Sequence, residues 1–158
     1  MHINITTEQM CAMVAQILPH SAEQNKNLPG INLAPRFVAC DAEQLRLELA
    51  YDTKSWMSNP MGVVHGGVIA ILLDNSMGPL CKCLCQGSTP TISMTLNYPR
   101  PVPLNATVHT RAHMVVFGRT SSQLTAEIFL PDEPDRVLAY ATGVYSTREH
   151  CDFTQSQC

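Results

Sequence analysis

The chain has 158 residues, of which 45% are hydrophobic and 15% charged, and this composition predicts one globular domain with a sizeable core. Its formal net charge of −3 argues against nucleic acid or an anionic membrane surface as a partner. No uninterrupted apolar run reaches the length of a membrane span, and the first ten residues lack the layout of a signal peptide, so we expect neither.

An amphipathic helix is predicted at residues 6–18, where Thr6 and Gln9 have the spacing of a capping box. Helical spacing places its apolar residues on one face, which comprises Met10, Met13, Val14, Ile17 and Leu18. Pro19 is expected to end this helix, and a polar linker follows to about residue 30.

Two short strands are predicted next, at residues 36–40 and 44–51, because apolar and polar residues alternate in the second of them. A loop rich in turn-forming residues then leads to a long apolar helix that begins near Gly66. Since proline has no N–H to donate, Pro79 is expected to end or kink this helix.

Four more alternating segments predict strands at residues 91–98, 106–117, 121–130 and 137–147. Short turns join the last three, which favours an antiparallel meander, and His109 and His113 fall on its polar face, where we expect them to meet solvent. A single long apolar helix needs cover on most of its sides. We therefore predict an α+β fold in which an antiparallel sheet of five to six strands wraps around one central helix.

Seven cysteines are present, and the odd number favours free thiols in a reducing cytoplasm. The run CKCLC, residues 81–85, does not have the spacing of a zinc site, so we expect no metal. On a helix, Cys81 and Cys85 would share a face while Cys83 points away.

The stretch VHGGVIAILLDN, residues 64–75, combines two features that are unusual in an apolar helix. The glycines Gly66 and Gly67 stand at the helix start, where unpaired N–H groups lie at the positive end of the helix dipole. They form either a tight entry into the helix or a backbone donor for a developing oxyanion. Asp74 is either a hydrogen-bonded core carboxylate or part of a site, because an unpaired buried carboxylate is costly.

A stripe of small residues runs along the same helix and contains Gly67, Ala70, Asp74 and Gly78, which indicates either a close helix contact or a slot for a ligand. Gly66 and Asp74 are eight residues apart, about 12 Å along a helix axis, so one small reacting group cannot touch both on one chain. A second copy of the helix, antiparallel across a two-fold axis, would bring its Asp74 to this Gly66. If both groups act on one substrate, the protein is at least a dimer with shared sites.

The pattern Asn59-x-x-Gly62-x-x-His65-Gly66-Gly67, followed after six residues by Asp74, resembles the hotdog-fold thioesterases of the phenylacetic-acid-pathway type. Three downstream segments fit this family in the same order: Tyr98-x-Arg100-Pro101, Phe117-Gly118-Arg119-Thr120 and Leu138-Ala139-x-Ala141-x-Gly143. The resemblance covers nearly all of residues 36–148, which we expect to be the core of a single hotdog domain with a tail at 149–158.

The resemblance implies hydrolysis of acyl-CoA thioesters by a homodimer or homotetramer, with no metal and no cofactor beyond the CoA of the substrate. It implies that Asp74 is the catalytic carboxylate, as general base or nucleophile, and that the Gly66 N–H polarises the thioester carbonyl. The other catalytic residues it implies are Asn59 and His65, near the carbonyl and the leaving sulfur, and Thr91, which helps to place water. The substrate-binding residues that the resemblance implies are Gly67, Gly118 and Arg119, the last two in a turn that in this family approaches the CoA phosphates.

Two other functions stay open at this stage. A hotdog protein that binds acyl-CoA as a sensor or carrier would keep the pocket and lose the base, so the presence of Asp74 favours the enzyme. An acyl-CoA hydratase on the same fold would carry an Asp/His pair in a different layout. The sequence does not indicate which acyl group is preferred.

Overall fold

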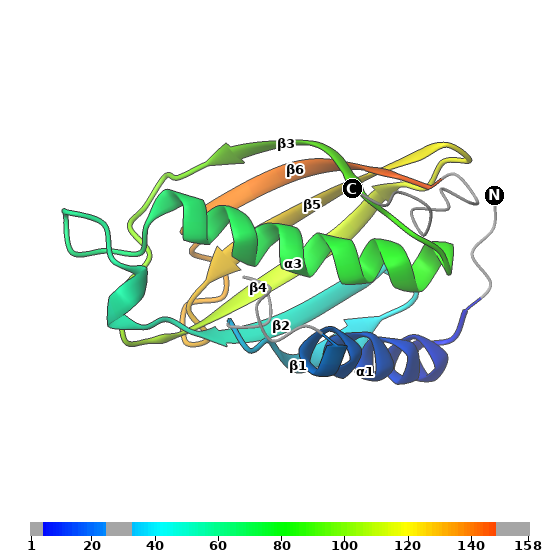
Figure 1. Cartoon of the computed structure of the whole chain (residues 1–158), viewed down its shortest axis with the longest axis horizontal. Coiled ribbons are helices and arrows are strands. Elements are labelled where there is room, and N and C mark those ends of the chain that lie inside the picture. The colour runs from blue at the N-terminus through cyan, green and yellow to red at the C-terminus, as the bar shows by residue number, and fades with distance from the viewer. Residues whose placement is uncertain (1–4, 25–32, 148–158) are drawn as a thin grey trace.

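A computed structural model describes residues 5–24 and 33–147, and these form a six-stranded antiparallel sheet with two helices and one short 3₁₀ helix (Figure 1). The elements in chain order are α1 (Thr7–Gln24), β1 (Arg36–Asp41), β2 (Arg46–Asp52), η1 (Ser55–Met57), α3 (Gly66–Cys85), β3 (Thr91–Asn97), β4 (Thr107–Val116), β5 (Ser121–Phe129) and β6 (Ala139–Ser146). The predicted α+β class and six strands are confirmed. The predicted linker and the tail at 149–158 lie largely or wholly outside the described residues.

The strands are ordered β1-β2-β4-β5-β6-β3, and every neighbouring pair is antiparallel. The predicted meander of the last three strands is therefore confirmed, and β1 and β3 are the two edges of the sheet. Register shifts in the β1–β2, β3–β6 and β4–β5 pairs mark irregularities of the bulge type, which bend a sheet. The bent sheet curves around α3 (Figure 1).

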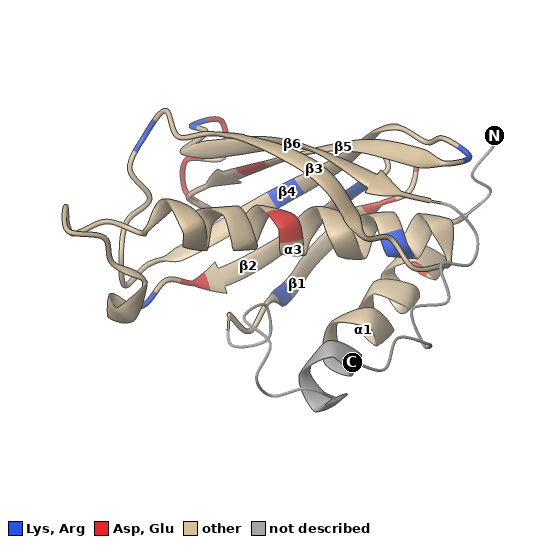
Figure 2. Cartoon of the chain, turned by 45° about the horizontal axis from the view of Figure 1, so that its top comes forward, with Lys and Arg blue, Asp and Glu red and all other residues tan. Residues whose placement is uncertain are grey.

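Helix α3 lies against the inner face of the sheet and is almost uncharged, with one acidic and one basic residue (Figure 2). The buried side chains it contributes to the core include Ile69, Leu72, Leu73, Met77 and Leu80. Its length and mean hydropathy of 1.4 would allow it to cross a membrane, but half of that window is buried inside the protein. A core helix meets the same criterion, so the expectation that no segment spans a membrane stays a prediction.

Both helices continue through a proline that we expected to limit them. Helix α3 runs six residues past Pro79 to Cys85, so the first of the two predicted effects of Pro79, an end of the helix, is wrong, and the other, a kink, stays a prediction. The proline leaves the carbonyl of Asn75 without its helical donor, but the turns beyond it bury Leu80 and Leu84, and this burial offsets the loss. Helix α1 similarly extends to Gln24 instead of ending at Pro19, while its predicted apolar face and capping box are confirmed.

The outer face of the sheet carries the predicted polar residues, with one difference. His113 is exposed as expected, whereas the His109 side chain is only 17% exposed, and its Nδ1 lies 2.9 Å from Glu48 Oε1. Phe129 meets the His109 ring edge to face. The cross-strand register decides these neighbours, and strand periodicity alone does not give that register.

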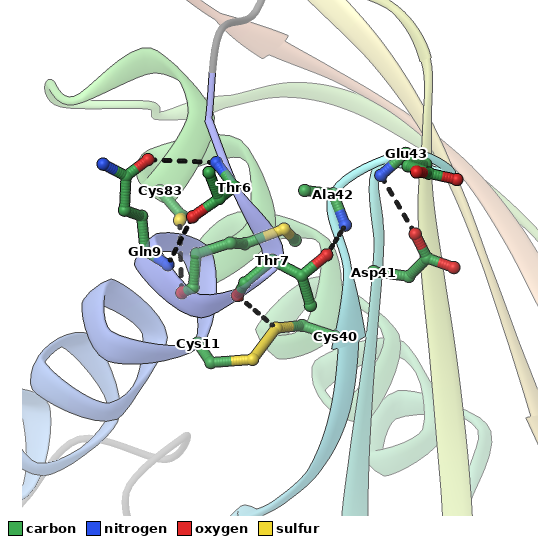
Figure 3. The surroundings of a disulfide bond; sticks show 10 residues. Thr6, Thr7, Gln9, Cys11, Cys40, Asp41, Ala42, Glu43 and Cys83 are labelled. Carbon is green, nitrogen blue, oxygen red and sulfur yellow. Dashed lines mark hydrogen bonds between the residues drawn. A yellow bond between two sulfur atoms is a disulfide. The ribbon is translucent and has the colours of Figure 1, made fainter.

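A disulfide joins Cys11 of α1 to Cys40 of β1, so the prediction of free thiols is wrong for these two residues (Figure 3). Packing of α1 beside β1 brings their Cα atoms to 6.1 Å, within the range that a disulfide spans. Thr7 adds a hydrogen bond to this contact, because its Oγ1 accepts from the Ala42 N–H at 3.1 Å. The cytoplasmic location inferred from free thiols stays a prediction, and the disulfide weakens its basis.

Reduction of this disulfide is expected to destabilise the protein. The bond closes a loop between residues 29 apart, for which the chain-entropy model gives a stabilisation of about 3–4 kcal/mol. Urea unfolding of the wild type with and without a reductant should therefore show a lower midpoint in the reductant. The Cys11→Ser variant should already have the lower midpoint and should not respond to the reductant. Equal midpoints for oxidised and reduced wild type would contradict the stabilising role.

The CKCLC cysteines lie as the helical spacing predicted. Cys81 Sγ is 3.7 Å from Cys85 Sγ, and Cys83 points elsewhere, with its Sγ 3.8 Å from the carbonyl oxygen of Met10. All three are free thiols, and burial raises the pKa of Cys83 to about 11, so that it stays protonated at neutral pH. Within residues 5–24 and 33–147, no three His, Cys, Asp or Glu side chains gather as a metal site would require.

Candidate active site

Asp74 lies in the middle of α3, half-buried, and is hydrogen-bonded to two strands. Its Oδ1 accepts from Thr91 Oγ1 at 2.9 Å and from the Tyr145 hydroxyl at 2.8 Å. Thr91 stands at the start of β3 and Tyr145 near the end of β6, and the two are register partners. Among the described residues nothing donates to Oδ2. The carboxylate is therefore held through one oxygen and has the other uncommitted.

The rotation of α3 that aims Asp74 at these strands is fixed on the opposite side of the helix. Ser76, two residues on and so about 200° around the helix, is buried against β2 and β4. Its Oγ lies 2.6 Å from Thr110 Oγ1 and 3.4 Å from the Tyr51 hydroxyl, and it donates to the Leu72 carbonyl at 2.8 Å. This buried polar contact sets one orientation of the helix, and Asp74 consequently faces β3 and β6.

Tyr145 is the buried member of the Asp74 contact, with 1% of its surface exposed. Burial, and to a lesser extent the neighbouring Asp74 charge, raise the pKa of Tyr145 well above its usual range. The phenol therefore keeps its proton at neutral pH, and it remains a hydrogen-bond donor. Sequence reasoning did not find this residue, because it is 71 positions from Asp74 and its contact depends on the sheet.

The N-terminus of α3 presents one unpaired backbone donor. The His65 carbonyl accepts from the N–H groups of Val68 and Ile69, and the His65 ring accepts from the Gly67 N–H through Nδ1 at 2.9 Å. The Gly66 N–H has no partner among the described residues. The predicted oxyanion donor is thus the first-turn amide that the fold leaves free, while Gly67 is committed to the cap.

His65 serves as the N-cap of α3, a role the sequence did not suggest. Because Nδ1 accepts the bond from Gly67, the neutral ring carries its proton on Nε2. That N–H is the ring atom available for a substrate. The predicted place of His65 near the carbonyl or the leaving sulfur stays a prediction.

Tyr98 lies over Gly66 and is a second residue to which the sequence assigned no role. Its hydroxyl donates to the Gly66 carbonyl at 3.3 Å, and its ring would lie 3.6 Å from a Cβ placed on Gly66. Half of the Tyr98 surface is exposed. The tyrosine of the Tyr98-x-Arg100-Pro101 segment therefore lines one side of the space next to Gly66, the residue with the free N–H.

Asn59 folds the loop that precedes α3. Its Oδ1 accepts from the N–H groups of Met61 and Val63 at 2.9 and 3.3 Å, and its carbonyl accepts from Gly62. Gly62 has a φ of +76°, which a residue with a side chain rarely adopts. The Asn59 carboxamide oxygen is thus committed to the loop, and its nitrogen has no partner in the described part of the chain. The predicted contact with the thioester carbonyl would have to come from that nitrogen.

Gly118 and Arg119 lie in the turn between β4 and β5. A Cβ on Gly118 would be 2.2 Å from the Ser121 carbonyl oxygen, so only glycine fits this turn. Arg119 is exposed. The Gly118 N–H donates to Ser122 Oγ at 3.2 Å, and the turn lies at the end of the sheet near the C-terminal end of α3 (Figure 1). Within one chain the structure therefore does not bring Arg119 to Gly66, which is at the other end of the helix.

The small-residue stripe of α3 meets the sheet at Asp74, which is bonded to β3 and β6, but is open at Gly78. None of its members is buried, and a Cβ added to Gly78 would meet no atom within 4 Å. Asn75, the residue after Asp74, has its carboxamide nitrogen buried without a partner among the described residues. The part of the stripe at Gly78 therefore makes no contact within the described part of this chain.

The site residues form two groups at different points along α3. Asp74, Thr91 and Tyr145 form the first, and Gly66, Gly67, His65 and Tyr98 form the second. Because α3 is continuous between them, eight residues separate the groups by about 12 Å along the axis. The predicted separation of Asp74 and Gly66 thus holds in the fold.

Comparison with known proteins identifies the fold. The model of the thioesterase superfamily matches residues 61–139, half of the chain. The acyl-coenzyme A thioesterase THEM4 of Xenopus laevis is 32% identical over 63 residues, which are 40% of this chain, and the match spans 28% of that protein's length. Among solved structures, the E. coli PaaI protein of the phenylacetic acid degradation operon has a TM-score of 0.75, 16% identity and coverage of 92% of this chain and 97% of its own.

A phenylacetic acid degradation-related protein of Ralstonia eutropha has a TM-score of 0.71 and 23% identity, with coverage of 85% of this chain and 98% of its own. At these identities the two structures establish a shared hotdog fold, and the family model, which covers the loop before α3 through the start of β6, establishes membership. The chain therefore belongs to the thioesterase superfamily.

Proposed function

We propose that this chain hydrolyses acyl-CoA thioesters to a free acid and CoA. The observation that carries the proposal is the Asp74 carboxylate, the one acidic group of the central helix, with Oδ1 held by two hydroxyls and Oδ2 uncommitted. A thioester hydrolase needs such a base or nucleophile. Family membership supports the reaction type, and the relative named as an acyl-coenzyme A thioesterase supports the substrate class.

In the reaction we propose, Asp74 acts at the thioester carbonyl carbon. As a general base, its Oδ2 takes a proton from a water molecule while the water oxygen bonds to that carbon. The Gly66 N–H donates to the oxygen that becomes negative, after which the C–S bond breaks and the CoA thiolate leaves, taking up a proton. As a nucleophile, Asp74 would bond to the carbon itself, the C–S bond would break and the CoA thiolate would leave and take up a proton. Water would then hydrolyse the resulting anhydride to the free acid and the Asp74 carboxylate. Thr91, at the exposed edge, would help to place the water in either case.

The site we propose lies between two chains, because Asp74 and Gly66 of one chain are too far apart to act together. The features that support a partner are the edge strand β3, whose Ile92 is 60% exposed, the half-exposed Tyr98 that follows it, and the open part of the α3 stripe at Gly78. An antiparallel copy of α3 would cover that stripe and could offer an acceptor to Asn75. The assembly is accordingly a homodimer or a pair of such dimers.

The CoA moiety is expected to meet Arg119 of the β4–β5 turn. Arg119 is exposed and its guanidinium has the geometry that recognises phosphate oxygens. Gly118 fixes the turn that presents it. No metal or further cofactor is part of the proposed reaction.

The test is hydrolysis of a panel of short, medium and aryl acyl-CoA esters by the purified protein. We expect loss of the thioester absorbance in at least one class, with equimolar free acid and CoA as products. Thioester absorbance is preferred to a thiol reagent because the chain has free cysteines of its own. Tight binding of the esters without turnover would instead support an acyl-CoA-binding protein, and addition of water to an enoyl-CoA would support a hydratase.

A further inference from the structure

We propose that Tyr145 is a positioning residue for the proposed hydrolysis, which holds Asp74 by Oδ1 so that Oδ2 is the reacting oxygen. The inference rests on the proposed function and assigns a role to a residue outside the loop and helix motif of the family pattern. It distinguishes the two oxygens of the carboxylate by their contacts.

Both hydroxyls that reach Asp74 donate to the same oxygen. Thr91 and Tyr145 are paired in register across β3 and β6, so their side chains emerge side by side toward α3. Their bonds to Oδ1 are 2.9 and 2.8 Å long. Two donors on one oxygen fix the plane of the carboxylate and concentrate the hydrogen bonding away from Oδ2.

Of the two donors, Tyr145 is the rigid one. The Thr91 residue is exposed and its hydroxyl can rotate toward water, as its predicted role requires. The Tyr145 ring is buried, and its hydroxyl has Asp74 as a charged acceptor. A tyrosine side chain has two torsions, and one that is packed on all sides loses little conformational entropy by holding a single geometry. Tyr145 can therefore fix the orientation of Asp74, while the Thr91 hydroxyl binds water.

Gly143 supplies the space that the Tyr145 ring occupies. The two residues are on the same face of β6, two positions apart. A Cβ on Gly143 would lie 2.8 Å from Tyr145 Cε2 and 3.1 Å from Met77 Cε, distances that require a neighbour to move. The backbone conformation of Gly143 does not require glycine, since its φ is not positive. The absence of a side chain at this position is therefore explained by the place of the ring.

The decisive variant is Tyr145→Phe, which removes the donor and keeps the ring. We expect kcat to fall about tenfold with KM changed by less than about twofold, because the contact is made to the reacting group and not to the substrate. Without the donor, the ionised carboxylate is less stabilised, so the acid limb of the kcat profile should move to higher pH. A residue that only supports the fold would not move that limb.

Two comparisons isolate the role from general packing. Tyr140→Phe alters an exposed tyrosine on the outer face of the same strand and should leave kcat and the pH profile unchanged. In an Asp74→Asn background, Tyr145→Phe should have little further effect, because the two residues act as a unit. Gly143→Ala should reproduce part of the loss by displacing the ring, and it provides the test if Tyr145→Phe does not fold.

These experiments distinguish failure of the positioning role of Tyr145 from failure of the proposed hydrolysis. Equal kcat and an unmoved acid limb in a folded, active Tyr145→Phe protein would overturn the positioning role and leave the proposed hydrolysis standing. A loss that persists undiminished in the Asp74→Asn background would overturn it as well. A wild-type protein that hydrolyses none of the acyl-CoA esters would overturn the proposed function and this inference with it.

Discussion

Replacement of Asp74 by asparagine is expected to lower kcat for thioester hydrolysis by about 10²–10⁴-fold, the range found for removal of a general base. The amide is close in size to the carboxylate, and its oxygen can still accept from Thr91 and Tyr145. The change therefore removes the charge and the basicity while it retains the contacts on which the local fold depends. Initial rates of thioester loss at saturating substrate measure the effect.

The matched control is Asp132→Asn, an exposed carboxylate on the connection between β5 and β6, which should keep the wild-type rate. Asp74→Ala is a second check, because an asparagine can revert slowly by deamidation and an alanine cannot. Thermal unfolding of Asp74→Ala should be measured with it, since two hydroxyls lose their acceptor in that variant. Equal rates for wild type and Asp74→Asn would remove Asp74 from the mechanism.

The parts of the fold that the sequence predicted are those with local causes. Alternation in QLRLELAY or SSQLTAEIFL follows from one face of a strand being buried, and the structure buries Leu47, Leu49, Leu124 and Ile128 accordingly. The capping box of α1 depends on residues three apart and is present. The ends of helices were less predictable, because burial beyond Pro79 outweighs the bond that proline removes.

The site was predictable to the extent that its residues follow one another along the chain. Gly66 and Asp74 are on one helix, so their separation could be calculated from helix geometry. Tyr145 and Tyr98 meet that helix only because β6 and β3 pass beside it, and no spacing in the sequence encodes such a contact. Gly143 could be identified in the sequence as part of a motif. The reason that glycine is needed there is the packing of the Tyr145 ring against it, which is a tertiary contact.

The cysteines show the same limit of prediction from sequence, since only local contacts could be foreseen. An odd count says nothing about which residues meet, and the Cys11–Cys40 pair depends on how α1 packs against β1. Cys81 and Cys85, which are four residues apart on one helix, could be placed on a shared face from the sequence, and they lie there. Local geometry could therefore be predicted, whereas partners brought together by packing could not.

Replacement of Gly66 by proline is expected to lower kcat by about 10²–10³-fold, the cost of one oxyanion donor. Proline is tolerated at the first position of a helix, and His65 before it has φ −61° and ψ 138°, a conformation that precedes proline readily. A Cβ at this position meets the Tyr98 ring at 3.6 Å, an ordinary contact. The variant therefore removes one N–H and should keep the fold.

Gly66→Ala is the matched control, because it adds a Cβ and retains the N–H. We expect it to keep most of the wild-type kcat, and circular dichroism of both variants should match the wild type. If alanine and proline reduce kcat equally, the space at Gly66 matters and the N–H does not. If neither reduces it, the oxyanion donor is elsewhere.

A heterodimer of one Gly66→Pro chain and one Asp74→Asn chain tests whether the site is shared. If the Gly66 N–H of one chain acts with the Asp74 of its partner, one of the two sites combines both intact groups and the other combines both defects. The heterodimer, isolated by two different affinity tags after co-expression, should then have about half of the wild-type activity, although each homodimer is nearly inactive. If both groups acted within a single chain, every chain would lack one of them and no activity would return. The restored activity therefore depends on which chain supplies each group, and this dependence follows from the roughly 12 Å between Gly66 and Asp74 along α3.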